Sequence, residues 1–249
     1  MEFEATVNSV SELAKALKRK AIAENTTWFR GHELDRYELL PSLARYANGI
    51  QSEAILIKRF KQNASTFLQR PPSNEWEWLF LMQHYNVPTR LLDWTESPLV
   101  GLYFVVCNPK HDKKPGHLWC LFPTKLNKYS GWKPALAANI PCFSVDSLLD
   151  AYSPTSLASE NQTALLPAAA LALRDNPRII AQHGVFTIMH RDDTPIENLQ
   201  QGNDHVGRFV VPAKAKKRIR DELVALRITK LAIFPELANV AVVANEVLT

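Results

Sequence analysis

Apolar residues recur every three or four positions in several stretches of the chain, which is the spacing of amphipathic helices. Ser9 and Glu12 form a capping box at the start of the first stretch. Ser97 and Pro98 have the residue types of a helix cap and a first helical position. The pattern predicts helices over residues 9–24, 51–69, a helix capped by Asn74 that carries Trp76 to Met82, and helices over 98–106, 214–226 and 234–244.

Short runs of β-branched and aromatic residues predict strands between these helices. The first run, Thr26–Phe29, delivers the tripeptide Arg30-Gly31-His32 at its end. Residues 156–173 are rich in Ala and Leu, and Pro167 is expected to break or kink any helix there. With no repeat and no linker, the mixture predicts a single α+β domain over residues 1–249. Further strands are predicted over residues 117–122, 184–190 and 208–211.

The composition is that of an ordinary globular protein. Among 249 residues, 46% are hydrophobic, and 29 Lys and Arg against 25 Asp and Glu give a net charge of +4. This surplus is too small to indicate nucleic-acid binding unless it is clustered. One basic run is expected to be the solvated face of an amphipathic helix. The alternative is that it contacts the phosphate backbone of a nucleic acid. The run consists of Lys214, Lys216, Lys217, Arg218 and Arg220.

Several classes of protein are not supported by the sequence. The patterns GxGxxG and GxxxxGK[ST] are absent, which argues against a Rossmann or P-loop nucleotide site. Cys107, His111, His117 and Cys120 have a metal-like composition, but His117 and Cys120 would point to opposite faces of a strand, so no metal site is expected. We expect a cytoplasmic protein without a membrane partner, because no stretch approaches the ~20 apolar residues of a bilayer span.

The richest candidate site is the polar segment from Gln83 to Ser97, which lies between two strongly apolar runs. Polar groups in such a setting are hydrogen-bonded internally or directed into a cleft, because burying them unpaired costs roughly 1–3 kcal/mol each. One interpretation is an Arg90–Asp93 ion pair that fixes a turn, with His84 bonded to backbone. The other is a pocket for a polar ligand. Its lining would be Gln83, His84, Thr89 and Asp93, with Tyr85 or Trp94 as an aromatic wall.

A second candidate is Arg30 beside Gly31. A guanidinium can hold a phosphate through two charge-assisted bonds, and glycine admits a close approach of the backbone. The alternative is a structural arginine that is bonded to carbonyl groups or to a carboxylate such as Asp93.

The motifs WFRGH, YELLPSLAR, LMQHYNVPTRLLDWTESPLVGLYFVV, IAQHGVFTI and IFPEL together resemble the FRG domain family, from about residue 26 to residue 237. The resemblance implies a protein of a bacterial or phage defence or toxin system, in a family whose biochemistry is poorly defined. The positions that match the family's motifs are Arg30, Gly31, Pro41, Gln83, His84, Pro88, Thr89, Arg90, Leu91, Asp93, Trp94, Ser97 and Gln182.

A more distant resemblance is to ADP-ribosyltransferases of the Arg-Ser-Glu type. Phe29-Arg30-Gly31 is similar to the first of their motifs, and Thr95-Glu96-Ser97 to the second. The third has Gln182 where a glutamate is expected. A neutral amide can bond a ribose hydroxyl but cannot stabilise an oxocarbenium charge, so Asp93 or Glu96 would have to supply that charge.

This resemblance implies an ADP-ribosyltransferase-like fold that binds NAD and cleaves its nicotinamide bond, with transfer to protein, nucleic acid or water. Arg30 would hold the pyrophosphate or ribose, Ser97 would orient the ribose and His84 would carry a proton. A partner protein could neutralise the activity. The alternative is a module without catalysis that senses nucleotides or binds nucleic acid. Either interpretation requires Arg30 and Asp93 to share one cleft.

Overall fold

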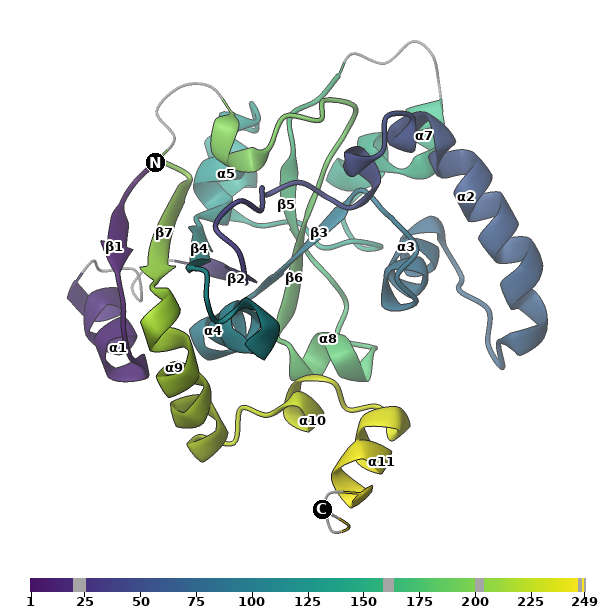
Figure 1. Cartoon of the computed structure of the whole chain (residues 1–249). Helices are drawn as coiled ribbons and strands as arrows, with labels where there is room; N and C mark the ends of the chain where they lie inside the picture. Colours follow the sequence, from purple (N-terminus) through teal and green to yellow (C-terminus); the bar gives the residue numbers. More distant parts are fainter. Residues whose placement is uncertain (20–25, 159–163, 200–203, 246–247, 249) are drawn as a thin grey trace.

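The structure is a computed structural model that describes residues 1–19, 26–158, 164–199, 204–245 and 248. Within these residues, seven strands form one mixed sheet in the order β1-β7-β4-β2-β3-β6-β5, with helices packed against it (Figure 1). This confirms the predicted α+β class. The strands are β1 (Glu4–Thr6), β2 (Trp28–His32), β3 (Leu91–Thr95), β4 (Gly116–Leu121), β5 (Ala168–Leu171), β6 (Gly184–Ile188) and β7 (Val206–Val211).

The predicted helices are present, with ends that shift by a few residues. The first is described from Val10 to Arg19, and residues 20–24, which the prediction also included, lie outside the described residues. Asn74 and Ser97 cap their helices as expected. The helices are α1 (Val10–Arg19), α2 (Gly49–Ala64), α3 (Glu75–His84), α4 (Pro98–Val106), α5 (Pro123–Tyr129), α6 (Pro134–Ala138), α7 (Pro154–Ala158), α8 (Pro177–Ala181), α9 (Ala213–Ala225), α10 (Lys230–Ile233) and α11 (Leu237–Asn245).

Besides β1, which the pattern did not predict, three features of the sheet differ from the sequence-based expectation. The strand expected to end at Phe29 continues to His32, so Arg30 and Gly31 lie within β2. The polar segment between α3 and α4 contains a strand, β3, which pairs along its whole length with β6. The Ala-rich stretch contains β5, whose Ala168 to Ala170 are fully buried in the core clusters on the two faces of the sheet. Its backbone pairs with β6 on one edge, and Asn127 of α5 bonds the backbone of Ala169 on the other.

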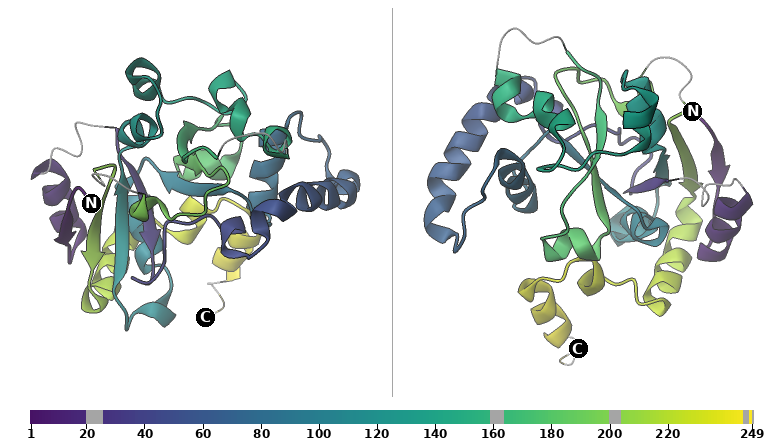
Figure 2. Two further views of the ribbon diagram at one scale, coloured as in Figure 1. Left: turned by 90° about the horizontal axis from the view of Figure 1, so that it is seen from above. Right: turned by 180° about the vertical axis from the view of Figure 1, so that it is seen from behind.

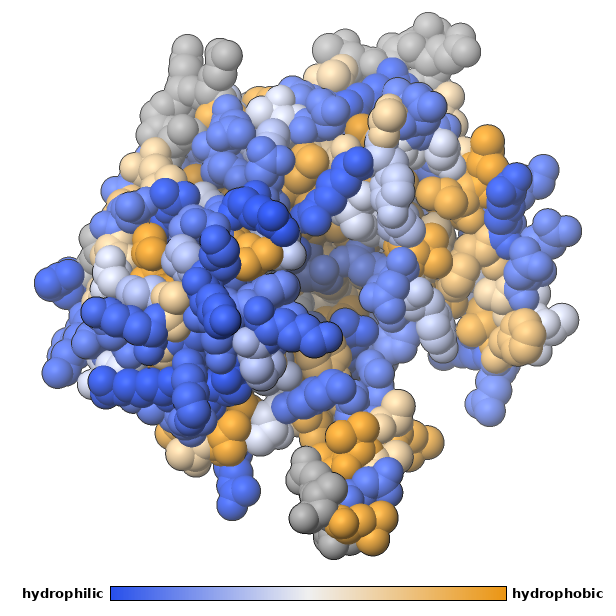
Figure 3. All heavy atoms as spheres, in the orientation of Figure 1, coloured by the Kyte–Doolittle hydropathy of each residue, from blue (hydrophilic) through white to orange (hydrophobic). Residues whose placement is uncertain are grey.

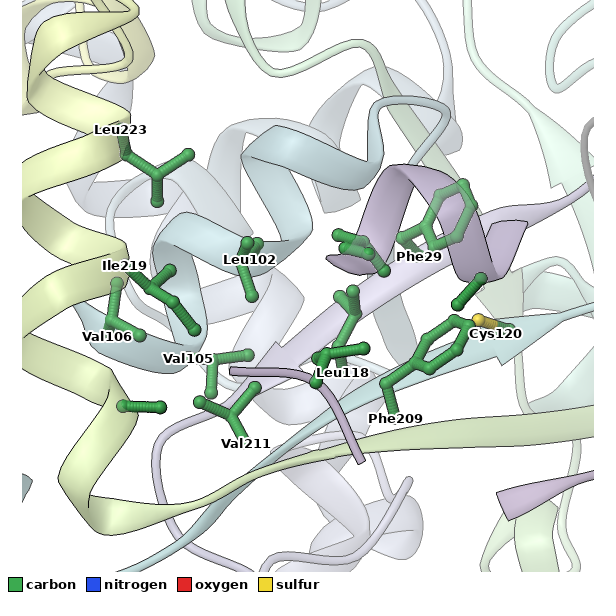
Figure 4. Packing of buried hydrophobic residues seen from close by; sticks show 14 of the residues in the cluster. Phe29, Leu102, Val105, Val106, Leu118, Cys120, Phe209, Val211, Ile219 and Leu223 are labelled. Carbon is green, nitrogen blue, oxygen red and sulfur yellow. The ribbon is translucent and has the colours of Figure 1, made fainter. Parts of the chain in front are cut away.

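One face of the sheet carries two groups of helices. Helices α1, α4 and α9 cover the half formed by β7, β4 and β2, where Phe29, Leu118 and Phe209 pack against them (Figure 4). The approach of α4 is close, since a Cβ on Gly31 would lie 2.2 Å from the Gly101 oxygen. Helices α2 and α3 cover the other half of the same face, over β3, β6 and β5 (Figures 1 and 2).

The opposite face is closed by the central tryptophans. Trp28, Trp94 and Trp119 pack there against α5 and the loop segments around Leu39 and Ile196. Among the described residues, no helix is long and apolar enough to cross a membrane.

Between the two helix groups, β2 and β3 are neighbours but pair at one register position, Phe29 with Thr95. By contrast, β2 pairs with β4 and β3 with β6 at every residue. The backbone groups of β2 and β3 beyond that position therefore need other partners, and the sheet has its weakest joint there.

Candidate functional site

A cleft of about 470 Å³ lies at this joint, between α3 on one side and α4 and α8 on the other. Its volume is in the range of small-molecule sites. Figure 3 shows a recess near the middle of this face with hydrophilic side chains around it. The polar residues that line it are Arg30, Ser42, Arg45, Gln83, His84, Asn86, Asp93, Thr95, Asn176, Arg178 and Gln182.

Arg30 lies at the joint itself. Its Nη1 donates to the Asp93 carbonyl oxygen at 2.6 Å and lies 3.9 Å from the Asp93 carboxylate. The guanidinium thus supplies a hydrogen bond to β3 where the β2 backbone no longer does. Burial lowers the pKa of Arg30 and Asp93 opposes this, but a guanidinium stays charged in proteins. No hydrogen bond within the described residues uses Nη2, which remains available to a ligand.

His32, two residues further along β2, contacts Arg30 from behind. The Arg30 Nε donates to the His32 Nε2 at 3.1 Å, and the His32 Nδ1 lies 3.1 Å from the Tyr37 carbonyl oxygen. Burial, and then the charge of Arg30, lower the pKa of His32 to about 3. His32 is therefore neutral at physiological pH.

Asp93 is held by a hydrogen-bond chain of its own. The Leu91 N–H donates to the Thr89 hydroxyl, so the hydroxyl hydrogen is free to donate to the Gln83 Oε1 at 2.6 Å. This fixes the orientation of the Gln83 amide, whose Nε2 donates to the Asp93 Oδ1 at 2.6 Å. The Asp93 side chain keeps 54% of its surface exposed, so the carboxylate is oriented yet open to a ligand.

The charges that line the cleft are mainly positive. Arg30, Arg45 and Arg178 face a single lining carboxylate, that of Asp93. Arg45 donates to the Leu40 oxygen through Nε and Nη2. An excess of guanidinium groups around a cleft favours an anionic ligand.

The remaining lining is apolar and largely aromatic. Phe29, Phe80, Phe104 and Phe186 lie along it, together with aliphatic groups such as Ile179. A ligand that combines an anion with a flat ring would satisfy both parts of the cleft.

The third strand of the candidate site, β6, starts beside the cleft. The Gln182 carbonyl oxygen accepts from the Thr95 hydroxyl at 2.6 Å, and its Nε2 lies 3.3 Å from the Ile233 oxygen. His183 follows with a φ of 47°, which ends α8 in a left-handed turn. Gln182 therefore lines the cleft, but its side-chain amide already bonds the Ile233 carbonyl oxygen in the C-terminal segment.

The sequence-based site is brought together in part. Arg30, Gly31, Gln83, His84, Asp93, Trp94 and Gln182 line the cleft. The close approach that the sequence analysis expected at Gly31 is made by helix α4, as described above. Trp94 is 3% exposed, and its indole N–H donates to the Thr187 hydroxyl, so most of the ring packs in the core. His84 is half-buried at the end of α3, and its Nδ1 has no hydrogen-bond partner in the described chain.

Other proposed residues lie outside the cleft lining. Glu96 pairs with Arg174, and Ser97 caps α4. Tyr85 is 60% exposed. Thr89 is buried and acts on the site through Gln83, as described above.

Arg90 does not pair with Asp93, contrary to one of the two sequence-based interpretations. It is fully buried, and its Nε bonds the Glu53 carboxylate at 2.8 Å. Nη1 and Nη2 donate to the carbonyl oxygens of Met189 and Tyr152. The spacing along the chain suggested the wrong partner, because in an extended strand residues three apart point to opposite faces.

The basic run on α9 is only partly a solvated face. Lys216 is buried, and its Nζ donates to the oxygens of Glu33 and His111. Lys217 and Arg218 pair with acidic residues one turn further along α9. Few of these cations remain for a nucleic acid.

The cysteine and histidine cluster of the sequence does not assemble. His117 lies on the same side of the sheet as Trp119 and makes an edge contact with its ring. Cys120 lies on the opposite side and packs in the core under α4. Burial raises the pKa of the Cys107 thiol to about 12, so it is no nucleophile. In the described part of the chain, no group of three or more His, Cys, Asp or Glu could hold a metal ion.

Sequence reasoning missed two of the three cleft arginines. Arg45 is the last residue of a short 3-10 helix, Leu43–Arg45, and Arg178 lies in the first turn of α8. No local pattern distinguishes them from surface arginines. The motif YELLPSLAR, which ends in Arg45, was a usable signal for the first of them.

The fold and its cleft define an α+β protein with an arginine-rich cleft at the joint between two central strands. Residues 25–114 match the FRG domain family, so the chain contains an FRG domain. This confirms the family resemblance over the part that holds Arg30 and Asp93; Gln182 lies beyond it. No curated protein and no solved structure matches the chain.

Proposed function

We propose that the cleft binds NAD and that the chain cleaves the nicotinamide glycosidic bond, as an ADP-ribosyltransferase or an NAD glycohydrolase. The observation that carries the proposal is the meeting of Arg30 and Asp93, from neighbouring strands, in one cleft of about 470 Å³. The strands of the three ADP-ribosyltransferase-like motifs, β2, β3 and β6, are also neighbours in the sheet, which supports the proposal.

In this mechanism the free edge of Arg30 binds the pyrophosphate, with Arg178 and Arg45 as further cations. The aromatic lining accepts the nicotinamide or adenine ring. The C1′–N1 bond breaks, and nicotinamide leaves with the electron pair as a neutral molecule. Asp93 faces the positive charge that develops on the ribose. Water or an acceptor then bonds to C1′ and gives its proton to His84 or Asp93.

A purified chain incubated with NAD tests the proposal, with free nicotinamide and ADP-ribose adducts measured by mass spectrometry. Arg30→Ala and Asp93→Asn should abolish turnover. Arg218→Ala should not, because Arg218 lies on the surface of α9 and pairs with Glu222. If NAD neither binds nor reacts, the proposal is overturned.

A second candidate is a nucleotide sensor without catalysis, which the Gln182 side chain favours. It is a neutral amide at the third motif, and its Nε2 is engaged by Ile233. NAD binding that Arg30→Ala abolishes, without any release of nicotinamide, would select this candidate. Activity that Gln182→Glu raises would favour the enzyme.

A further inference from the structure

We propose that His32 is a positioning residue for the ligand-binding arginine, and that it fixes the Arg30 guanidinium through a single tautomer. This inference rests on the proposed binding of an anion by Arg30. His32 itself is only 4% exposed and does not line the cleft. Its effect on a ligand therefore passes through Arg30.

The tautomer follows from the donors and acceptors present. The Arg30 Nε always carries hydrogen and can only donate, so the His32 Nε2 must be the bare, accepting nitrogen. The ring proton is then on Nδ1, which donates to the Tyr37 carbonyl oxygen. Tyr37 also packs its ring edge-on against His32 at 5.9 Å between centroids. The imidazole is held on both sides and has one orientation.

This orientation decides where the guanidinium points. With Nε held by His32 and Nη1 held by the Asp93 carbonyl, rotation about the end of the side chain is blocked. A guanidinium that is fixed before binding loses less conformational entropy when the anion arrives. Without His32, Arg30 would keep its charge and its bond to the Asp93 carbonyl, but it would lose the second contact that fixes its direction.

Two substitutions separate the two nitrogens of His32. The Gln oxygen in His32→Gln reaches about as far as Nε2 and can accept from Arg30, whereas the shorter amide of His32→Asn stays near the Nδ1 position and reaches only Tyr37. Both variants remove the ring and its packing. They therefore share most of any structural damage and differ at the Arg30 contact.

The binding experiment uses NAD and ADP-ribose with the full chain. We expect His32→Gln to bind within about threefold of the unchanged protein and His32→Asn to bind about tenfold more weakly. His205→Asn is the control, since His205 is a buried histidine outside the cleft lining that bonds the Ile196 oxygen. It should leave affinity unchanged. Equal affinity of His32→Gln and His32→Asn would overturn the inference.

Nitrogen NMR of the imidazole gives a readout that needs no ligand. The spectrum should show hydrogen on the His32 Nδ1 and a bare Nε2, and the Arg30 Nε–H should exchange more slowly than that of Arg45. A proton on Nε2 would contradict the inference. If the unchanged protein binds neither probe, the proposed function fails, and the NMR result still decides the role of His32.

Discussion

Arg30 lies within β2 and Arg90 directly precedes β3, and these two arginines have different kinds of partner. Arg90 is fully buried, and all three of its nitrogens are bonded to protein groups. Arg30 keeps 22% of its side chain exposed and one nitrogen unused by the described residues. Each also depresses the pKa of a buried histidine, His32 or His190. The unused donor distinguishes Arg30, the proposed binding arginine, from Arg90, which anchors the fold.

The strongest test of the anchoring role is Glu53→Ala. It leaves the Arg90 charge buried without its carboxylate partner, and breaking such a pair typically costs about 3–5 kcal/mol. We expect a loss of that size in the free energy of unfolding measured with urea. Asp93→Ala should cost less than about 1 kcal/mol, because the Asp93 side chain is 54% exposed.

The double variant Glu53→Ala with Arg90→Met is the control, since it removes the uncompensated charge. It should recover part of the lost stability. If Glu53→Ala and Asp93→Ala destabilise the protein equally, Arg90 is not the anchor described here.

The matching test of the binding role is Arg30→Lys. Lysine keeps the charge but cannot bond His32, the Asp93 carbonyl and a ligand in fixed directions at once. Loss of one charge-assisted bond, roughly 1.5–3 kcal/mol, lowers affinity for ADP-ribose by about 10- to 150-fold. Calorimetry measures this, and the unfolding free energy should change by only about 1 kcal/mol. Unchanged affinity would mean that charge alone is used.

The sequence predicted the elements whose pattern is local. The strands predicted over residues 184–190 and 208–211 from their apolar and β-branched residues overlap β6 and β7. The β5 segment was missed because alanine favours helices, and burial between α5 and β6 overrides that preference. The β3 segment was missed because Asp93 and its polar neighbours obscured a strand that β6 supports.

The site was predictable to the extent that polar groups stood out between apolar runs. Asp93 was found in this way, whereas Arg30 was found as an arginine beside Gly31 at the end of an apolar run. The partners that decide the two roles are distant in the chain, Glu53 and Met189 for Arg90 and Asp93 for Arg30, so no local pattern shows them. Only the fold shows which arginine has a donor to spare.

The two histidines, His32 beside Arg30 and His190 beside Arg90, predict how the stability of the protein changes in acid. Burial, and then the neighbouring arginine, lower the pKa of His190 to about 4 and that of His32 to about 3. In the unfolded chain both titrate near 6.5. The unfolded state therefore binds more protons below about pH 6.5, so stability is present above that pH and is lost as pH falls toward 4. Each histidine contributes a slope of up to about 1.4 kcal/mol per pH unit.

Urea unfolding at pH 7, 6 and 5 measures this slope. His190→Asn keeps an acceptor for the Leu165 N–H, which bonds the His190 Nδ1, but removes the titrating ring. Its stability should fall less steeply with acid than that of the unchanged protein. An identical slope would show that His190 is not held neutral by the Arg90 region.

The smallest effect concerns the cleft arginine that already has a carboxylate partner. Arg178 Nη1 lies 3.8 Å from the Glu236 Oε1, and Phe234 packs over the guanidinium. Such half-exposed pairs are worth about 0–1 kcal/mol, so Glu236→Gln should free Arg178 and raise affinity for ADP-ribose by up to about fivefold.

Asp221→Asn, on the surface of α9, is the control. The gain should shrink as salt is added, because screening weakens the competition between the carboxylate and the ligand for Arg178. A fall in affinity would instead mean that Glu236 orients Arg178 for the ligand as His32 orients Arg30, and the two arginines would then belong to one class.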